Sequence, residues 1–264
     1  MSTSVGTEKL IVNGKRLDGR SASDLRPLKM EVGILKKANG SAMVEWGKNK
    51  VIAGVYGPRE VLPKHMTNPH KAIIKARYAM APFCSLEEHG RMGPNRRAHE
   101  IAKVAKHVFE NAVLVDQFPK TMINVTMEVL QSDGGTRVSA ITAASLAMAD
   151  AGIPMRGIPC GIAVGKIDGQ MVVDLDKAED NKGQSDMPLV VMPDTGEILL
   201  FQMDGMLSKD EVARGIDLAF EAANKVREKQ VEALKTKYEK VELEINGENA
   251  GGDGGKPASE ITVI

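Results

Sequence analysis

The sequence predicts a layered α/β fold, with α+β character and mixed sheets, on the basis of two observations. Strand-like apolar runs, joined by short turns rich in glycine, asparagine and aspartate, alternate with segments of helical period. These segments follow the order strands–helix–strand–helix and then strands–helix, which indicates two similar β–α halves. A chain of 264 residues, 42% hydrophobic and 27% charged, is long enough to bury a full core.

The first third of the chain reads as antiparallel strands. Three apolar runs within residues 28–58 are separated by KKANG and GKNK, as expected for consecutive hairpins. Residues 72–83 predict a further strand. Residues 58–71, rich in proline and basic side chains, predict a surface loop between the two.

The rest of the chain alternates between helices and hairpins. A helix is expected over residues 96–114, a strand over 121–130, and an alanine-rich helix after the glycines at 134 and 135. Hairpins are expected around residues 168–169 and 193–196, and a long helix from the capping box at 208–211 to about residue 241. The buried stripe of the first helix is predicted to be Ile101, Val104, Ala105, Val108 and Ala112.

Composition excludes several classes of protein. The 35 basic and 35 acidic side chains balance, so any contact with nucleic acid depends on local clustering of charge. With one tryptophan, three tyrosines and five phenylalanines, an extensive base-stacking platform is not expected. The chain has no secretion signal and no apolar run of membrane-spanning length, and its two cysteines read as buried free thiols. These features favour the cytoplasm and exclude a membrane partner.

The turn SDGGTR, where a strand pattern gives way to a helix, is the first candidate for chemistry. A helix N-terminus carries unpaired N–H groups and partial positive charge, which attract anions. Gly135 allows close approach of a ligand, Thr136 is expected to cap the helix, and Arg137 offers a fork of donors for phosphate oxygens. The alternative is an ordinary capped turn with a surface arginine.

The second candidate is a basic helix. Arg96, His99, Lys103 and Lys106 fall at steps of three or four and share one face, and Arg97 sits beside them at the helix start. Two arginines at a helix N-terminus are mildly unfavourable without an anion, so a phosphate would stabilise them. The alternative is a solvated face.

The third candidate is an acidic loop, whose carboxylates are Asp174, Asp176, Glu179, Asp180 and Asp186. Asp186 directly precedes the apolar run MPLVV, which places a carboxylate at the mouth of a buried strand. Carboxylates beside phosphate-binding groups suit Mg²⁺ binding or proton donation to a leaving oxygen. The alternative is a surface turn cluster. The loop matches no EF-hand, and the chain contains no P-loop, GxSxG or HExxH motif.

Together these stretches resemble the RNase PH family of phosphate-dependent exoribonucleases, and within it the catalytic subunits of the archaeal exosome. The resemblance is carried, in the expected order over residues 10–241, by DGRSASDLRPLK, ARYAMAPF, RMGPNRRAHEI, LQSDGGTR, DLDKAEDNKGQSDMP and PDTGEILLFQMDG. It implies a fold of two similar β–α halves, with helices between and outside the sheets, in a single catalytic domain over residues 1–245. Residues 246–264 would form a flexible glycine-rich tail.

The resemblance also implies a reaction and its residues. Inorganic phosphate would attack the last phosphodiester at an RNA 3′ end and release a nucleoside diphosphate, and the reverse reaction would add nucleotides. Gly135, Thr136, Arg137 and Arg97 would hold phosphate, and Asp186, Asp180 and Arg137 would be catalytic, with both aspartates near any Mg²⁺. The RNA would lie along Arg96, Arg97, His99, Lys103 and Lys64.

The implied partners are RNA, an inactive RNase PH-like paralogue that completes a hexameric ring, and RNA-binding cap subunits. Two alternatives stay open: a non-catalytic RNA-binding ring subunit, and a homohexameric RNase PH that trims tRNA ends. Inactive paralogues tend to lose the turn arginine or the acidic pair, whereas this chain keeps Arg137, Asp180 and Asp186. Thr136 stands where relatives often carry serine, and its hydroxyl can donate in the same way.

Overall fold

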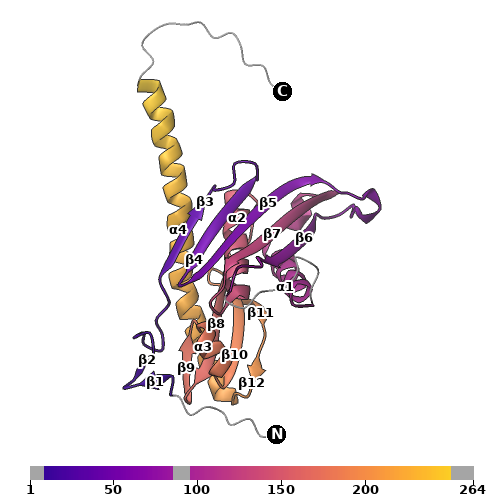
Figure 1. Ribbon diagram of the computed structural model, residues 1–264. Coiled ribbons are helices and arrows are strands. Elements are labelled where there is room, and N and C mark those ends of the chain that lie inside the picture. Colours follow the sequence, from indigo (N-terminus) through magenta and orange to yellow (C-terminus); the bar gives the residue numbers. More distant parts are fainter. Residues whose placement is uncertain (1–8, 86–95, 251–264) are drawn as a thin grey trace, which may run out of the picture.

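Two five-stranded sheets enclose a central helix in the computed structural model (Figure 1). The structure describes residues 9–85 and 96–250, with side chains described to residue 239. The elements in chain order are β1(Ile11–Val12), β2(Lys15–Arg16), β3(Leu28–Val32), β4(Gly40–Trp46), β5(Asn49–Glu60), η1(Lys64–Met66), β6(Ile73–Met80), α1(Arg96–Ala112), η2(Val115–Gln117), β7(Thr121–Gln131), α2(Thr136–Asp150), β8(Cys160–Ile167), β9(Gln170–Val173), α3(Lys177–Lys182), β10(Ser185–Met192), β11(Glu197–Phe201), β12(Asp204–Gly205) and α4(Lys209–Ala250).

The two sheets come from the two halves of the chain. The first has the strand order β3-β4-β5-β7-β6, in which only β6 and β7 are parallel, joined through α1. The second has the order β11-β10-β8-β9, with β12 paired to β10, and its pairs are all antiparallel. The first sheet is therefore mixed, as expected, whereas the second is antiparallel, and the expected two β–α halves are confirmed.

Helix α2 lies between the sheets and is buried on all sides. It contacts β4, β5 and β7 of the first sheet and β8 and β10 of the second. A glycine on β8 allows the helix to come this close. A Cβ on Gly161 would lie 2.6 Å from the carbonyl oxygen of Val138 on α2. One hydrophobic cluster consequently runs through both halves. Helix α4 packs along β8 and β3 and extends well past the sheets (Figure 1).

The N-terminal segment is tied to the second half of the chain. Leu10 packs with Ile167, Val172 and Leu175 in a small separate cluster. The backbone N–H of Leu10 donates to Asp168 Oδ2 at 2.7 Å. Arg16 forms a buried ion pair with Glu179, so residues far apart in the sequence meet behind α3.

Most predicted elements are confirmed, with four differences. Residues 177–182, expected to be loop, form α3, and Phe109 joins the buried stripe of α1 while Val104 is only half-buried. The short strands β1, β2 and β12 were not predicted because two residues show no periodicity. Helix α4 runs to Ala250, past its predicted end near residue 241 and through the first residues of the expected tail; residues 251–264 lie outside the described part. Cys84 and Cys160 are buried and free, as predicted.

The described helices include no segment both long and apolar enough to pass through a bilayer.

Candidate active site

The N-terminus of α2 is built from two consecutive glycines in the left-handed region. Gly134 has φ +73° and Gly135 has φ +65°, conformations that side chains rarely adopt. The N-cap residue is Gly135, and no side chain of the described residues caps the helix. The expectation that Thr136 caps it is wrong: Thr136 is already helical and buried, and its hydroxyl accepts a hydrogen bond from Tyr78 Oη at 3.2 Å. The amides of the first turn are thus left for an anion.

This helix end opens into a small pocket of about 50 Å³ that gathers the predicted catalytic residues. Four parts of the chain contribute to it: the start of α1, the start of α2, strand β8, and the segment from just before α3 into β10. The lining residues are Arg97, Gly135, Thr136, Arg137, Val138, Ala163, Leu175, Asp180, Asp186 and Pro188. The structure therefore brings together the turn, one of the paired arginines and the acidic pair, as predicted.

Arg137 is held by neighbours that the sequence did not single out. Its Nη1 donates to Gln202 Oε1, and its Nη2 lies 3.4 Å from Glu100 Oε1. Gln202 in turn donates from Nε2 to Glu100 at 3.2 Å. These contacts fix the guanidinium between α1 and the residue after β11, with its remaining N–H groups available for a ligand.

The two pocket aspartates hold their protons unusually tightly. Burial raises the pKa of Asp186 to about 6, and the nearby carboxylate of Asp180 adds to this effect against the attraction of Arg137. Burial also raises the pKa of Asp180, although Arg97 and Arg137 oppose it. A carboxyl that keeps a proton near neutral pH is suited to act as a general acid.

The other three acids of the predicted loop have structural roles, so the cluster is not one functional group. Asp174 is buried and accepts from Arg26 Nη2 at 2.7 Å and from Trp46 Nε1 at 3.0 Å. Asp176 caps α3 in a capping box with Glu179. Glu179 also pairs with Arg16. Only Asp180 and Asp186 line the pocket.

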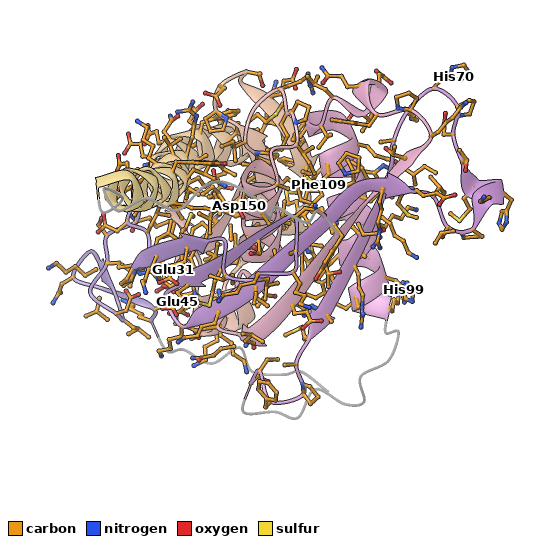
Figure 2. The ribbon with its side chains drawn as sticks, turned by 90° about the horizontal axis from the view of Figure 1, so that it is seen from above. Glu31, Glu45, His70, His99, Phe109 and Asp150 are labelled. Atoms are coloured by element: carbon orange, nitrogen blue, oxygen red, sulfur yellow. The ribbon has the colours of Figure 1, made fainter. Side chains whose placement is uncertain are left out.

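The remaining candidates for RNA contact lie outside the pocket lining. Arg96, His99 and Lys103 are exposed on α1, next to the pocket through Arg97. Lys64 lies in η1 on the β5–β6 loop, where it pairs with Glu60 at 3.4 Å. His70 marks this protruding loop in Figure 2, well apart from His99 on α1. Their contact with RNA stays a prediction.

Sequence reasoning missed the residues behind the pocket. Arg26 and Asn49 grip the SDGG turn, and Gln202 binds Arg137. Arg26 and Gln202 occur within the stretches that carry the family resemblance, but no local pattern assigns them a role. Asn49 is the third residue of the GKNK turn, where an asparagine is typical of ordinary turns.

The described residues of the pocket offer Mg²⁺ only two protein ligands, both carboxylates. Asp180 and Asp186 are two carboxylates, and the described residues contain no group of three or more His, Cys, Asp or Glu side chains able to hold a metal. Mg²⁺ commonly binds proteins through one or two carboxylates, with water and substrate phosphates completing its shell. The two aspartates fit that pattern.

Family models match nearly the whole described chain. Residues 24–154 match domain 1 of the 3′ exoribonuclease (RNase PH) family, and residues 157–222 match its domain 2. The chain belongs to this family. The boundary between the two family domains falls in the connection from α2 to β8, so each family domain supplies one sheet.

Relatives in this family are similar over most of the chain. The exosome complex component Rrp41 of Pyrococcus abyssi is 55% identical over 242 residues, covering 92% of this chain and 97% of the relative. The protein of the same name from Thermoplasma acidophilum is 50% identical over 223 residues, covering 84% and 90%.

Solved structures of the family share the fold. Rice (Oryza sativa) Rrp46 superposes with a TM-score of 0.72 at 27% identity, covering 81% of this chain and 98% of Rrp46. A chain of the Archaeoglobus fulgidus exosome with RNA bound to the active site has a TM-score of 0.71 at 23% identity, covering 82% and 93%. Both likenesses support the fold.

Proposed function

We propose that this protein is a phosphate-dependent 3′-to-5′ exoribonuclease that releases nucleoside diphosphates from RNA 3′ ends, and that it is the active subunit of an exosome ring. The observation that carries the proposal is the pocket itself. It combines an uncapped helix N-terminus, two arginines and two carboxyls with raised pKa values. A site that only binds an anion would not require the two carboxyls. An enzyme that hydrolyses RNA with water would not require a second anion site for inorganic phosphate beside the RNA phosphate.

Phosphate binds at the start of α2 in this proposal. The first-turn amides after Gly135, the hydroxyl of Thr136 and the guanidinium of Arg137 face the attacking phosphate, and Arg97 bridges it to the RNA. Phosphate and RNA are both anions, so they approach in line only where fixed positive groups offset their repulsion. Arg96, His99 and Lys103 continue the basic surface along α1 and hold the RNA backbone without reading bases.

Asp186 supplies the proton. An oxygen of inorganic phosphate forms a bond to the phosphorus of the last phosphodiester, and the bond from that phosphorus to the 3′ oxygen of the preceding nucleotide breaks. The protonated Asp186 carboxyl donates to this leaving oxygen, and the terminal nucleotide departs as a diphosphate. Run backwards, the same steps add a nucleotide to the RNA and release phosphate. Burial raises the pKa of Asp186, and the neighbouring carboxylate of Asp180 raises it further.

Asp180, and Asp186 once it has given up its proton, would also hold Mg²⁺ together with phosphate oxygens. When bound there, the ion would neutralise charge that develops on the reacting phosphates.

Assembly with a partner is supported by exposed apolar side chains at the edge of the second sheet. Ile198, Phe201, Met203 and Met206 are 40%, 43%, 46% and 87% exposed, within and just after the edge strand β11. Several large apolar groups so close together usually mark a protein interface. The proposed partners are an inactive RNase PH-like paralogue, which alternates with this chain in a hexameric ring, and RNA-binding cap subunits.

The test uses an oligoribonucleotide carrying a labelled phosphorus in its 3′-terminal linkage. The purified chain, alone and with a candidate paralogue, is incubated with and without inorganic phosphate, and the labelled products are separated. The proposal requires labelled diphosphate that depends on phosphate. Monophosphate release that is independent of phosphate would refute it.

The same experiment separates the two alternatives. A homohexameric enzyme would be active and ring-sized by light scattering without any partner. A non-catalytic subunit would bind the RNA yet release no nucleotide, either alone or with the candidate inactive paralogue.

A further inference from the structure

We propose that Arg26 is a positioning residue for phosphate: from behind the pocket it orients the SDGG turn so that the start of α2 faces the ligand. Arg26 precedes β3, is 6% exposed and does not line the pocket. The inference rests on the proposed function, because it assigns phosphate to the N-terminus of α2.

The Arg26 side chain is locked by Asp174. Its Nη2 donates to Asp174 Oδ1 at 2.7 Å, its Nε to Oδ2 at 3.1 Å, and its backbone N–H to Oδ2 at 2.7 Å. Trp46 donates to the same carboxylate from the first sheet. A buried arginine paired so completely has a fixed direction, and its remaining donors point at one target.

That target is the peptide backbone of the turn. Arg26 Nη1 donates to the carbonyl of Asp133, and its Nη2 lies 3.5 Å from the carbonyl of Gly134. Asn49, fully buried, completes the grip: its Nδ2 donates to Gly134 O at 2.5 Å, and its Oδ1 accepts from Asp133 N–H at 2.5 Å. Both carbonyls are therefore turned toward Arg26 and Asn49.

The orientation of these peptide groups matters because each has an N–H group that attracts an anion and a carbonyl oxygen that repels it. Gly134 and Gly135 are the residues of the turn whose backbone rotates most freely, and a rotated peptide would point a carbonyl oxygen at the phosphate instead of an N–H. The glycines that permit close approach of the ligand thus also need an external clamp. Arg26 and Asn49 provide it, so the amides are aligned before phosphate arrives.

The clamp also reaches the acidic side of the pocket. A Cβ on Gly134 would lie 2.6 Å from the backbone of Asp176, so the turn rests directly on the start of α3, which carries Asp180. Arg26 therefore fixes the distance between the phosphate cradle and one of the acids from a single anchoring point, Asp174.

The test is the variant Arg26→Lys, which keeps a positive charge but loses the fork that spans Asp174 and the two carbonyls. We expect the KM for inorganic phosphate to rise about tenfold, below the roughly hundredfold cost of an ångström of misplacement. Binding of RNA in phosphate-free buffer should stay within about twofold of the unchanged chain, since Arg26 is not near the α1 surface. The shift in Tm caused by added inorganic phosphate should shrink in parallel.

The matched control is Lys237→Met. It removes a different ion pair, at the opposite end of α2, where Nζ of Lys237 on α4 lies 2.6 Å from Oδ1 of Asp150. It should lower Tm and leave the KM for phosphate unchanged. An equal rise of that KM in the control, or none in Arg26→Lys, overturns the positioning role. If Arg26→Lys does not fold, Asn49→Ser carries the test, with a smaller rise of about threefold expected for one lost contact.

Failure of this inference is distinguishable from failure of the proposed function. If the unchanged chain with its partner releases no diphosphate and its Tm does not respond to inorganic phosphate, the proposed phosphate site itself is wrong. If both responses are present and Arg26→Lys keeps them at the same phosphate concentrations, only the role of Arg26 is wrong.

Discussion

The five carboxylates between residues 174 and 186 fall into two regions with opposite physics. On the buried side, Asp174 and Glu179 pair with Arg26 and Arg16, and Asp176 caps α3, so each of these three side chains stabilises the fold. On the pocket side, burial raises the pKa values of Asp180 and Asp186. One short stretch of chain thus contains groups that hold the protein together and groups that cost stability. The difference teaches that a carboxylate is available for chemistry where none of the described residues forms an ion pair with it.

The largest effect is expected from Asp186→Asn, which removes the proposed proton donor and keeps the shape of the side chain. Turnover should fall about a thousandfold, within the range of general acid catalysis. Retention of RNA on a filter should survive, because the carboxylate serves chemistry and the basic groups serve binding. Equal loss of turnover and of RNA retention would contradict the assignment of Asp186 to proton donation rather than to RNA binding.

On the buried side, Glu179→Gln should destabilise the protein by about 3–5 kcal/mol, because it leaves Arg16 as a buried charge without its partner. Chemical denaturation at pH 7 measures this. The matched control is Glu197→Gln, which breaks the exposed pair with Arg156 at 2.9 Å and should cost less than about 1 kcal/mol. Similar losses in both variants would mean that burial does not distinguish the two regions.

Asp186→Asn should have the opposite effect on stability, a gain of about 1–2 kcal/mol at pH 7 in metal-free buffer. The folded-state pKa of Asp186, about 6, lies above the unfolded value of 3.8. Above pH 6 the carboxylate is ionised in both states and its burial disfavours folding; below pH 4 it is protonated in both and the penalty vanishes. Denaturation midpoints of both proteins across this range give the answer. A loss of stability at neutral pH would show that Asp186 is a structural acid like Glu179.

The smallest effect expected is on the coupling inside the pocket. Asp180→Asn should lower the pKa of Asp186 by less than about one unit, because burial contributes more than the neighbouring charge. A carbon NMR titration of aspartate carboxyls in metal-free buffer resolves the shift, with exposed Asp116→Asn as the control that should leave it unchanged. If the pKa of Asp186 is the same in the Asp180→Asn variant, the two carboxyls do not interact electrostatically.

The sequence predicted the elements well wherever their signals were local. Strand alternation, the Asp168–Gly169 turn and the capping box at Ser208 depend on neighbouring residues, and all three are found in the structure. Helix α3 was missed because six residues show barely more than one helical turn. Residue types marked the SDGG turn as a candidate anion site, whereas only the family resemblance singled out Asp180 and Asp186; the pocket brings the turn and these two acids together.

Local patterns do not predict how the five acids divide between buried pairs and the pocket, and only the family resemblance singled out Asp180 and Asp186. The division depends on which carboxylates meet Arg16 and Arg26, and those contacts close loops of 163 and 148 residues. No periodicity in the chain encodes such a pairing. For the same reason Asn49 and Gln202, which complete the site from distant turns, carried no local signal.

The central claim is that phosphate bound at the start of α2 attacks RNA that is protonated by Asp186. The most direct measurement incubates unlabelled RNA, the chain and its partner with radiolabelled inorganic phosphate, and then analyses the nucleotides released. The account predicts label in the β-phosphate of nucleoside diphosphates, and none with Asp186→Asn. Unlabelled nucleoside monophosphates as the product would contradict it.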